Sequence, residues 1–381
     1  MGVYIHIPFC VRKCLYCDFA SAPARLSIRK AYMSALVREV ERSPYRGVQA
    51  DSIFFGGGTP SVIASDDLIR VLDAVGRAFT VAPDAEITIE CNPGDDQSDR
   101  WRKQSMSAFL QSLHSAGFNR LSLGVQSFDD SLLRALGRIH NADSARRTYG
   151  EAREAGFSNI NIDLMFALPG QTRKQWSNTL RTAVALAPEH LSAYSLIVEE
   201  GTPFGRLETA GDFPRPSQDT EAAMYTDAVA ILDSNGYARY EVSAFARKGF
   251  HCRHNLHYWN YDHYLGFGAS ATSQAGYLRW TNTADPKEYT RRIDIQESPQ
   301  GSCEDLNSST RMTETMMMGL RLADGVNRRR FADWYGVDPV ECYNSEIAVP
   351  VDNGLLEVTE SAVRMTPRGF LLGNEVWESF V

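Results

Sequence analysis

The sequence predicts an α/β fold built on a parallel sheet, either doubly wound or curled into a full or partial barrel. Short β-rich runs alternate with longer segments of helical spacing from the first residue to about residue 244, which gives six βα units in series. Helical segments end in a glycine just before the next strand at Gly117, Gly156 and Gly236, as expected of helix C-caps. Beyond about residue 285 the alternation stops, so a small separate domain is expected there.

Each predicted unit begins with a strand. The strands cover residues 3–7, 52–55, 86–90, 120–125, 159–164 and 190–197. The helices that follow them cover residues 28–42, 67–79, 107–116, 142–155, 174–186 and 220–235. Residues 206–217 contain prolines and few aliphatic side chains, which indicates a surface loop within the last unit.

The C-terminal part has a different pattern. Residues 314–322 and 329–335 have helical spacing, residues 355–365 are typical of a hairpin, and an amphipathic helix ends the chain. We expect a small helical domain of winged-helix type that packs against the α/β part. The predicted division is residues 1–244 for the α/β core, 245–284 for an extension that completes it, and 285–381 for the C-terminal domain.

Composition excludes some classes of protein. The chain has 39 Lys and Arg against 47 Asp and Glu, and its formal net charge of −8 argues against nucleic acid as a partner. No apolar run approaches the ~20 residues of a membrane-spanning helix, and the first residues do not resemble a signal peptide. We therefore expect a cytoplasmic protein. Four of its cysteines are then ordinary thiols: Cys91, Cys252, Cys303 and Cys342.

The other three cysteines, Cys10, Cys14 and Cys17, fall within eight positions after the first predicted strand. An odd number of thiols in one short loop argues against disulfides and favours a metal ion or a metal cluster. Thiolates at C-x3-C-x2-C spacing can hold three irons of a [4Fe–4S] cluster and leave the fourth iron open. The alternative is a zinc site with His6 as a further ligand, although zinc sites usually pair two C-x2-C knuckles.

Polar residues or glycines also stand at the ends of the other predicted strands. They are Gly57, Gly58 and Thr59 after the second strand, Glu90 ending the third, Gln126 after the fourth with Arg138 beyond it, and Asp163 in the fifth. Each alone has a structural explanation as a turn, a cap partner or a satisfied buried charge. Because the carboxyl ends of parallel strands meet at one edge, we expect these residues and the three thiols to share one pocket.

Several short motifs together resemble one protein family. They are YIHIPFC, FFGGGTPS, IECNP, LSLGVQSF, LGRIH, NIDLMFALPGQT, LSAYSL, YEVSAFA and CRHNLHYW, and they span almost the whole chain. As a set they resemble the radical S-adenosylmethionine (SAM) superfamily, in the branch that contains oxygen-independent coproporphyrinogen III oxidase and the heme chaperones. This resemblance implies a partial (β/α)6-type barrel with its cluster at the carboxyl ends of the strands.

The resemblance also implies roles for individual residues. Cys10, Cys14 and Cys17 would ligate the cluster. The residues expected to contact SAM are Tyr4, Tyr16, Gly57, Gly58, Thr59 and Glu90. In the oxidase a second SAM is contacted at the positions that match Gln126, Arg138, Asp163 and Ile197.

Three features bear on the choice within that branch. The oxidase has a further cysteine where this chain has Phe19, and a long extension before a motif that only nine residues precede here. The HNLHYW segment, residues 254–259, is a hallmark of the chaperones. One departure is Thr272, which stands where chaperones usually have a histidine. Taken together, these features argue against porphyrinogen decarboxylation and favour a chaperone.

We therefore expect a heme chaperone that binds heme, a [4Fe–4S] cluster and SAM. The resemblance implies heme-requiring respiratory membrane proteins as recipients, contacted transiently at the membrane, and bacterioferritin as a source. The alternative is a radical enzyme of the same lineage, such as a methyltransferase, cyclopropanase or anaerobic heme-degrading enzyme, so whether SAM is cleaved is left open. Heme needs an apolar slot for its ring and cations for its propionates, and His254, His257 and Cys252 are the candidates where an axial ligand is used. His254 is the residue expected to contact heme, although a packed aromatic loop explains the segment as well.

Overall fold

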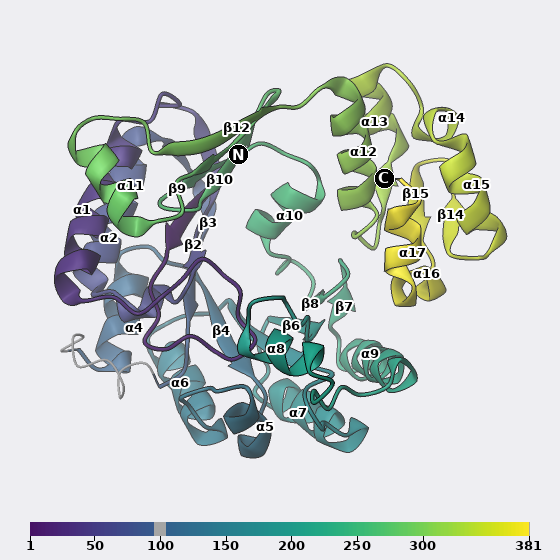
Figure 1. The fold of residues 1–381 in the computed structure, drawn as a ribbon, viewed down its shortest axis with the longest axis horizontal. Helices are drawn as coiled ribbons and strands as arrows, with labels where there is room; N and C mark the ends of the chain where they lie inside the picture. The colour runs from purple at the N-terminus through teal and green to yellow at the C-terminus, as the bar shows by residue number, and fades with distance from the viewer. Residues whose placement is uncertain (95–103, 381) are drawn as a thin grey trace.

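The computed structural model describes residues 1–94 and 104–380 (Figure 1). Six parallel strands lie side by side in chain order at the centre of a 12-stranded sheet. They are β1 (Gly2–Ile7), β2 (Gln49–Gly57), β3 (Thr80–Cys91), β4 (Arg120–Gln126), β5 (Ile160–Phe166) and β6 (His190–Ser195). The sheet ends at β12 on one side and β7 on the other, which are not paired with each other in the described chain. The predicted α/β partial barrel is therefore confirmed.

The helices between the strands cover the outer face of the sheet (Figure 1). They are α1 (Leu26–Glu41), α2 (Ser65–Ala78), α4 (Met106–Ser115), α6 (Ala142–Glu154), α7 (Arg173–Ala185) and α9 (Gln218–Asp233). Several begin at a side-chain cap, and Thr172 and Gln175 form a full capping box at α7. Gly117 and Gly156 have φ of 106° and 104°, so the predicted C-cap glycines do adopt the left-handed conformation that side chains disfavour.

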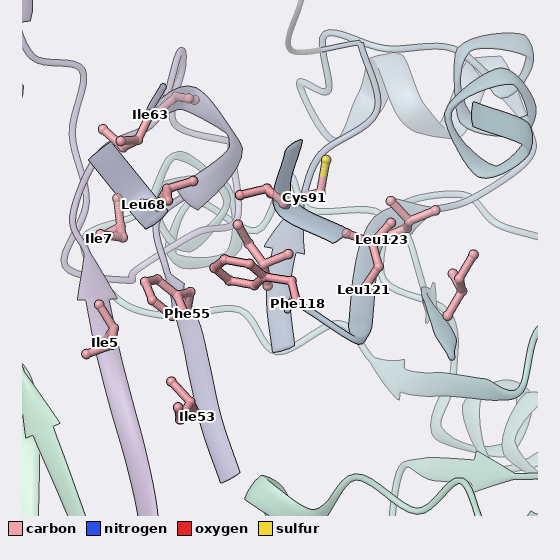
Figure 2. Packing of buried hydrophobic residues seen from close by; sticks show 14 of the residues in the cluster. Ile5, Ile7, Ile53, Phe55, Ile63, Leu68, Cys91, Phe118, Leu121 and Leu123 are labelled. Carbon is pink, nitrogen blue, oxygen red and sulfur yellow. The ribbon is translucent and has the colours of Figure 1, made fainter. Parts of the chain in front are cut away.

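The main core lies between the sheet and these helices. Phe55 of β2 packs against Phe118, with ring centroids 5.0 Å apart, and Ile53 and Leu121 lie on either side of them (Figure 2). All four side chains are fully buried. Strands buried in this way are typical of parallel sheets with helices over them. This packing fixes the positions of the strands, and thereby the positions at which the loops at their carboxyl ends begin.

Some elements were not predicted. Helix α8 (Pro203–Thr209) begins before the expected loop 206–217 and runs into it, with Thr202 as its N-cap and Pro203 in its first turn. A short α5 (Asp130–Ala135) precedes α6. The sheet is also extended at both sides, by β7 (Ala238–Arg239) and β8 (Ala244–Ala246) beyond β6, and by β9 (Tyr264–Phe267), β10 (Thr272–Ala275), β11 (Leu278–Asn282) and β12 (Gln300–Asp305) beyond β1. Of these strands, β9, β10 and β11 fall within residues 245–284, where an extension was expected, although its strands were not predicted individually.

The chain after residue 285 differs from the expected division. Helix α11 (Pro286–Asp294) packs on α1, where Tyr289 donates a hydrogen bond to the Glu39 carboxylate, and β12 pairs with β11. Residues 286–305 thus belong to the α/β part, whereas we expected the C-terminal domain to start at residue 285. The boundary differs because α11 and β12 contact α1 and β11, and the sequence pattern does not show which distant elements a segment will contact.

A second core follows in the C-terminal unit. Its helices are α12 (Ser308–Gly319), α13 (Arg328–Tyr335), α14 (Pro339–Cys342), α15 (Asn344–Asp352), α16 (Pro367–Leu371) and α17 (Gly373–Glu378). Its strands β13 (Val326–Asn327), β14 (Leu356–Val358) and β15 (Ala362–Met365) form a small sheet in the order β13-β15-β14. Met316, Phe331 and Val363 are buried at its centre. This arrangement of helices and a hairpin agrees with the expected winged-helix type.

The C-terminal unit is joined to the α/β part by ionic contacts. Arg279 of β11 pairs with Glu314 of α12, which also accepts a hydrogen bond from Tyr261. Arg330 pairs with Asp262.

No helix in residues 1–94 or 104–380 combines the length and the apolar character needed to cross a bilayer.

Candidate functional site

A cavity of about 490 Å³ lies at the carboxyl ends of the parallel strands. Twelve of the residues predicted from the sequence line it: Cys10, Cys14, Tyr16, Cys17, Gly57, Gly58, Thr59, Glu90, Gln126, Arg138, Asp163 and Ile197. Tyr4 and His254 line a second, smaller cavity of about 250 Å³ instead. We call these the outer and the inner cavity. Both are bordered by Glu90, Ser122 and Asp163.

The three cysteines lie in the loop between β1 and α1. Cys10 is buried, and its Sγ is 3.5 Å from both Ser21 Oγ and Thr59 Oγ1. Cys14 is half-buried, and its Sγ accepts a hydrogen bond of 3.4 Å from Arg138. Hydrogen-bond donors around ligating sulfurs are typical of iron–sulfur sites. The surroundings of the thiols therefore fit a cluster.

The zinc alternative receives no support from this geometry. In the described part of the chain, no three His, Cys, Asp or Glu side chains converge where one metal ion could be held. His6, the possible further ligand, has Nδ1 3.0 Å from the Tyr4 hydroxyl and Nε2 3.2 Å from the carbonyl of Ala20. An iron–sulfur cluster does not require the three thiols to converge on one metal ion, because each cysteine binds a different iron.

The glycine turn after β2 brings bare backbone to the cavity. Gly57 has φ of 115°, and a Cβ there would lie 2.6 Å from the His6 ring. A Cβ on Gly58 would lie 2.7 Å from the carbonyl oxygen of Phe9. The amides of Gly58 and Thr59 bond to the carbonyls of Ile7 and Phe9, at 2.9 and 2.8 Å. The turn is thus fastened to the cysteine loop, and only glycine fits it.

Two carboxyl groups lie on the wall between the cavities. Burial, and then the nearby Asp163, raises the pKa of Glu90 to about 8. Burial also raises the pKa of Asp163, which accepts hydrogen bonds from Ser122 and Asn161 at 3.2 and 2.7 Å. Glu90 itself accepts one from the Gly57 amide at 3.1 Å. Such a pair can exchange protons or hold a polar ligand near neutral pH.

Other polar contacts complete the outer cavity. Arg138 donates hydrogen bonds of 2.5 Å to Asn92 Oδ1 and to the carbonyl of Gly124. Gln126 accepts a hydrogen bond of 2.7 Å from the Tyr194 hydroxyl. Asn92 and Tyr194 were not predicted as site residues. The position of Asn92, two residues after Glu90 in the IECNP motif, is the sequence signal that could have indicated it.

The HNLHYW segment lies away from the outer cavity, in α10 (Arg253–Trp259) near the amino ends of the strands. His254 is 1% exposed, with Nδ1 3.0 Å from Ser52 Oγ and Nε2 2.9 Å from the Tyr258 hydroxyl. Both ring nitrogens therefore have partners inside the protein. The expected contact of His254 with heme is at odds with this packing, because the ring would have to leave its partners to reach a ligand.

The other candidate heme ligands are also engaged. The Cys252 thiol is buried and donates a hydrogen bond of 3.4 Å to Glu86. His257 lies between Asp51 and Asp262, at 2.8 and 3.4 Å. These contacts give the segment a packing role.

Thr272 stands in the sheet extension. Its hydroxyl is 2.9 Å from that of Thr281 on the neighbouring strand β11. Thr272 lines neither the outer nor the inner cavity. The missing histidine therefore leaves both cavities unaltered.

Comparison with known proteins shows the family. The chain matches the radical SAM superfamily over residues 4–183 and the HemN C-terminal domain over residues 306–372. It is 38% identical to the heme chaperone HemW of Bacillus subtilis, over 100% of this chain and 99% of that protein. The HemW of Escherichia coli is 32% identical, over 100% and 98%. The chain belongs to the HemW family.

A solved structure supports the same placement. Coproporphyrinogen III oxidase (HemN) from Escherichia coli, described as a radical SAM enzyme, superposes with a TM-score of 0.82 at 25% identity, covering 100% of this chain and 89% of that one. The HemN C-terminal domain match starts at residue 306, two residues before α12, the first helix of the C-terminal unit of this HemW family member. Membership of the radical SAM superfamily implies a [4Fe–4S] cluster and SAM.

Proposed function

We propose that this HemW family member is a heme chaperone that holds a [4Fe–4S] cluster through Cys10, Cys14 and Cys17 and binds SAM next to it. The observation that carries the proposal is that three thiols share one cavity with the glycine turn and Glu90. The heme function is supported by the relatives named heme chaperone, at 32 to 38% identity over the full chain. When bound, the cluster supplies the electron that can split the sulfonium of SAM.

The outer cavity offers suitable groups for SAM. We assign backbone contacts to Gly57 and Gly58, whose missing side chains allow a close approach. Glu90 would accept a hydrogen bond from a donor of SAM, with Thr59 and Tyr16 beside it. A second SAM, if one binds, would contact Gln126, Arg138, Asp163 and Ile197.

For heme we propose the mouth of the outer cavity. Two large apolar side chains are exposed on its rim, Phe19 at 64% and Ile197 at 69%. Exposed apolar side chains at a cavity can serve as a binding surface for an apolar ligand. Arg12 and Lys13 line the same cavity and supply cations for propionates. The mouth thus has the apolar face and the cations that heme needs, and His254 is not required.

The cluster is tested by anaerobic reconstitution with iron and sulfide. The wild type should become brown with iron–sulfur absorption, and the change of Cys10, Cys14 and Cys17 to alanine should abolish the colour. Cys303→Ala and Cys342→Ala are matched controls, because both thiols are exposed and lie outside the cavity. Colour that survives the triple change, or zinc in anaerobically prepared protein, would overturn the proposal.

The heme site is tested by titration of heme into three variants. Phe19→Ser with Ile197→Ser should weaken binding, whereas Leu207→Ser, which removes an exposed leucine outside the cavity, should not. His254→Ala should retain heme affinity at a temperature where it is folded. Normal affinity in the double variant together with loss in His254→Ala would place heme at α10 instead.

A second candidate function is a radical enzyme of the same lineage. It is favoured by Gln126, Arg138 and Asp163, which line the outer cavity as a second cosubstrate would require. Product analysis after anaerobic reduction with SAM distinguishes the two. Rapid 5′-deoxyadenosine formation stimulated by a substrate supports the enzyme, and stoichiometric heme uptake with slow turnover supports the chaperone.

As a chaperone, the protein would act in the cytoplasm. We propose heme-requiring respiratory proteins as recipients and bacterioferritin as a source of heme. Support for these partners comes from the resemblance to the heme chaperones alone. Heme transfer from the loaded protein to each candidate, followed by absorption spectroscopy, tests them.

A further inference from the structure

Within the described residues, the inner cavity is lined by a buried cation that has an ionic contact but no hydrogen-bond acceptor. Arg120, at the start of β4, is 2% exposed and lines this cavity of about 250 Å³. Its Nε has no hydrogen-bond partner, and the described residues provide no hydrogen bond to the rest of its guanidinium. A buried guanidinium normally has several acceptors, because removing the charge from water is costly. Arg120 therefore has an ionic contact with Glu86 but needs hydrogen-bond acceptors that the described residues do not supply.

The nearest acid is committed elsewhere. Glu86 Oε2 lies 3.9 Å from Arg120 Nε, beyond hydrogen-bonding distance. The Glu86 carboxylate instead accepts hydrogen bonds from the backbone amides of Arg253 and His254, at 3.0 and 3.2 Å, and one from the Cys252 thiol. Glu86 thus fastens the start of α10 and leaves the donors of Arg120 unused.

The other polar groups of the wall are also engaged with one another. Asn161 donates hydrogen bonds of 2.7 Å to Ser122 and to Asp163, and its carbonyl oxygen faces His190 Nδ1 at 2.7 Å. Asp163 receives a further hydrogen bond from Ser122. This network satisfies Asp163 without Arg120. An acceptor for Arg120 has to come from a molecule inside the cavity.

We propose that the inner cavity binds a small monocarboxylate, with its carboxylate on Arg120. A guanidinium matches a planar carboxylate with two parallel hydrogen bonds. The volume of about 250 Å³ limits the ligand to a small molecule. Glu90 and Asp163 on the wall shared with the outer cavity disfavour a second carboxylate, so the rest of the ligand is uncharged or cationic. The inner cavity shares Glu90 and Asp163 with the proposed SAM site, whereas Arg120 lines the inner cavity and not the outer one. The contact between the carboxylate and Arg120 therefore depends neither on the cluster nor on heme.

The test uses propionate and its uncharged analogue propionamide in one sample of the full chain. Saturation-transfer NMR should show binding of propionate and about tenfold weaker transfer to propionamide, because only the carboxylate pairs with the guanidinium. Succinate should bind more weakly than propionate. Equal transfer to propionate and propionamide would mean that the carboxylate is not recognised, and no transfer to either would mean that the cavity holds water only. Either result would overturn the proposal.

Two variants place the binding in the inner cavity. Arg120→Gln should abolish the propionate signal. Because loss of a buried arginine can impair folding, Asn255→Asp is the second variant, which adds a carboxylate to the wall of the inner cavity and not to the outer one. It should also abolish the signal, whereas Asn235→Asp in an exposed turn should not. An undiminished signal in Asn255→Asp would overturn the proposal.

Discussion

The backbone amide of Gly57 donates a hydrogen bond of 3.1 Å to the carboxylate of Glu90. This bond joins the glycine turn after β2 to the end of the neighbouring strand β3. The turn is also bonded to the cysteine loop through the amides of Gly58 and Thr59. Three consecutive strand ends are thus linked by backbone groups, and changes in any of them should be felt at the proposed cluster site.

The first prediction concerns the space at Gly58. Gly58→Ala should lower the affinity for SAM by more than about tenfold and destabilise the chain by about 1–3 kcal/mol, because its Cβ would lie 2.7 Å from the Phe9 carbonyl oxygen. Gly76→Ala is the control, since no atom lies within 4 Å of its Cβ in α2. That change should stabilise the helix by about 0.5–1 kcal/mol. Urea unfolding and equilibrium SAM binding measure both variants, and equal behaviour would contradict a tight turn.

The second prediction concerns the pH dependence of stability. Burial and the nearby Asp163 raise the pKa of Glu90 to about 8, from an ordinary value of 4.5. The folded chain keeps a proton there that the unfolded chain releases above its own pKa. The stabilisation is therefore fully present below about pH 4.5 and is lost as pH rises through about 8.

Glu90→Gln isolates this contribution. Urea unfolding of the ligand-free chain should show wild-type stability falling relative to the variant as pH rises, with a slope of at most about 1.4 kcal/mol per pH unit. Other titrating groups occur in both proteins and cancel in the difference. A difference that stays constant between pH 5 and pH 9 would show that Glu90 titrates normally.

The third prediction concerns Arg138, which donates a hydrogen bond of 3.4 Å to the sulfur of Cys14. Arg138→Leu should shift the reduction potential of the reconstituted cluster to more negative values, on the order of tens of millivolts, because hydrogen bonds and positive charge stabilise the reduced state. A redox titration followed by electron paramagnetic resonance measures this shift. Arg134→Leu, on the exposed side of α5, should leave the potential unchanged. The same reduction potential in both variants would mean that Arg138 does not influence the cluster.

The fourth prediction concerns His254. His254→Ala should lower the free energy of unfolding by about 2–4 kcal/mol, because it leaves a cavity and removes the partner of Ser52 and Tyr258. His263→Ala removes an exposed histidine and should cost far less. Denaturant unfolding measures both. A stable His254→Ala protein would contradict the packing role of this residue.

Much of the outer cavity could be predicted from local patterns. Six βα units place their strands in chain order, so the carboxyl end of every strand reaches the same edge. A residue such as Glu90 or Gln126 at a strand end is thereby assigned to that edge once the strand is recognised. The glycine turn could also be predicted, because consecutive glycines after a strand indicate a backbone that a ligand can approach closely.

The inner cavity and the place of residues 286–305 in the α/β part could not be predicted in this way. His254 bonds to Ser52, 202 residues away in the chain, and Tyr289 bonds to Glu39 across 250 residues. A sequence pattern indicates which residue types are present but not which distant partner satisfies them. The segment HNLHYW therefore looked like a ligand site, although its histidine is held by the strand it covers.

The sequence by itself determined the alternation of strands and helices, the spacing of the three thiols and the presence of the glycine turn, since each depends on neighbours in the chain. Only the tertiary structure decided that residues 286–305 join the α/β part, that His254 is enclosed, and that Arg120 is buried without a hydrogen-bond acceptor among the described residues. These outcomes depend on which distant groups meet in the folded protein. A buried group is available to a ligand only when no such neighbour has already paired with it.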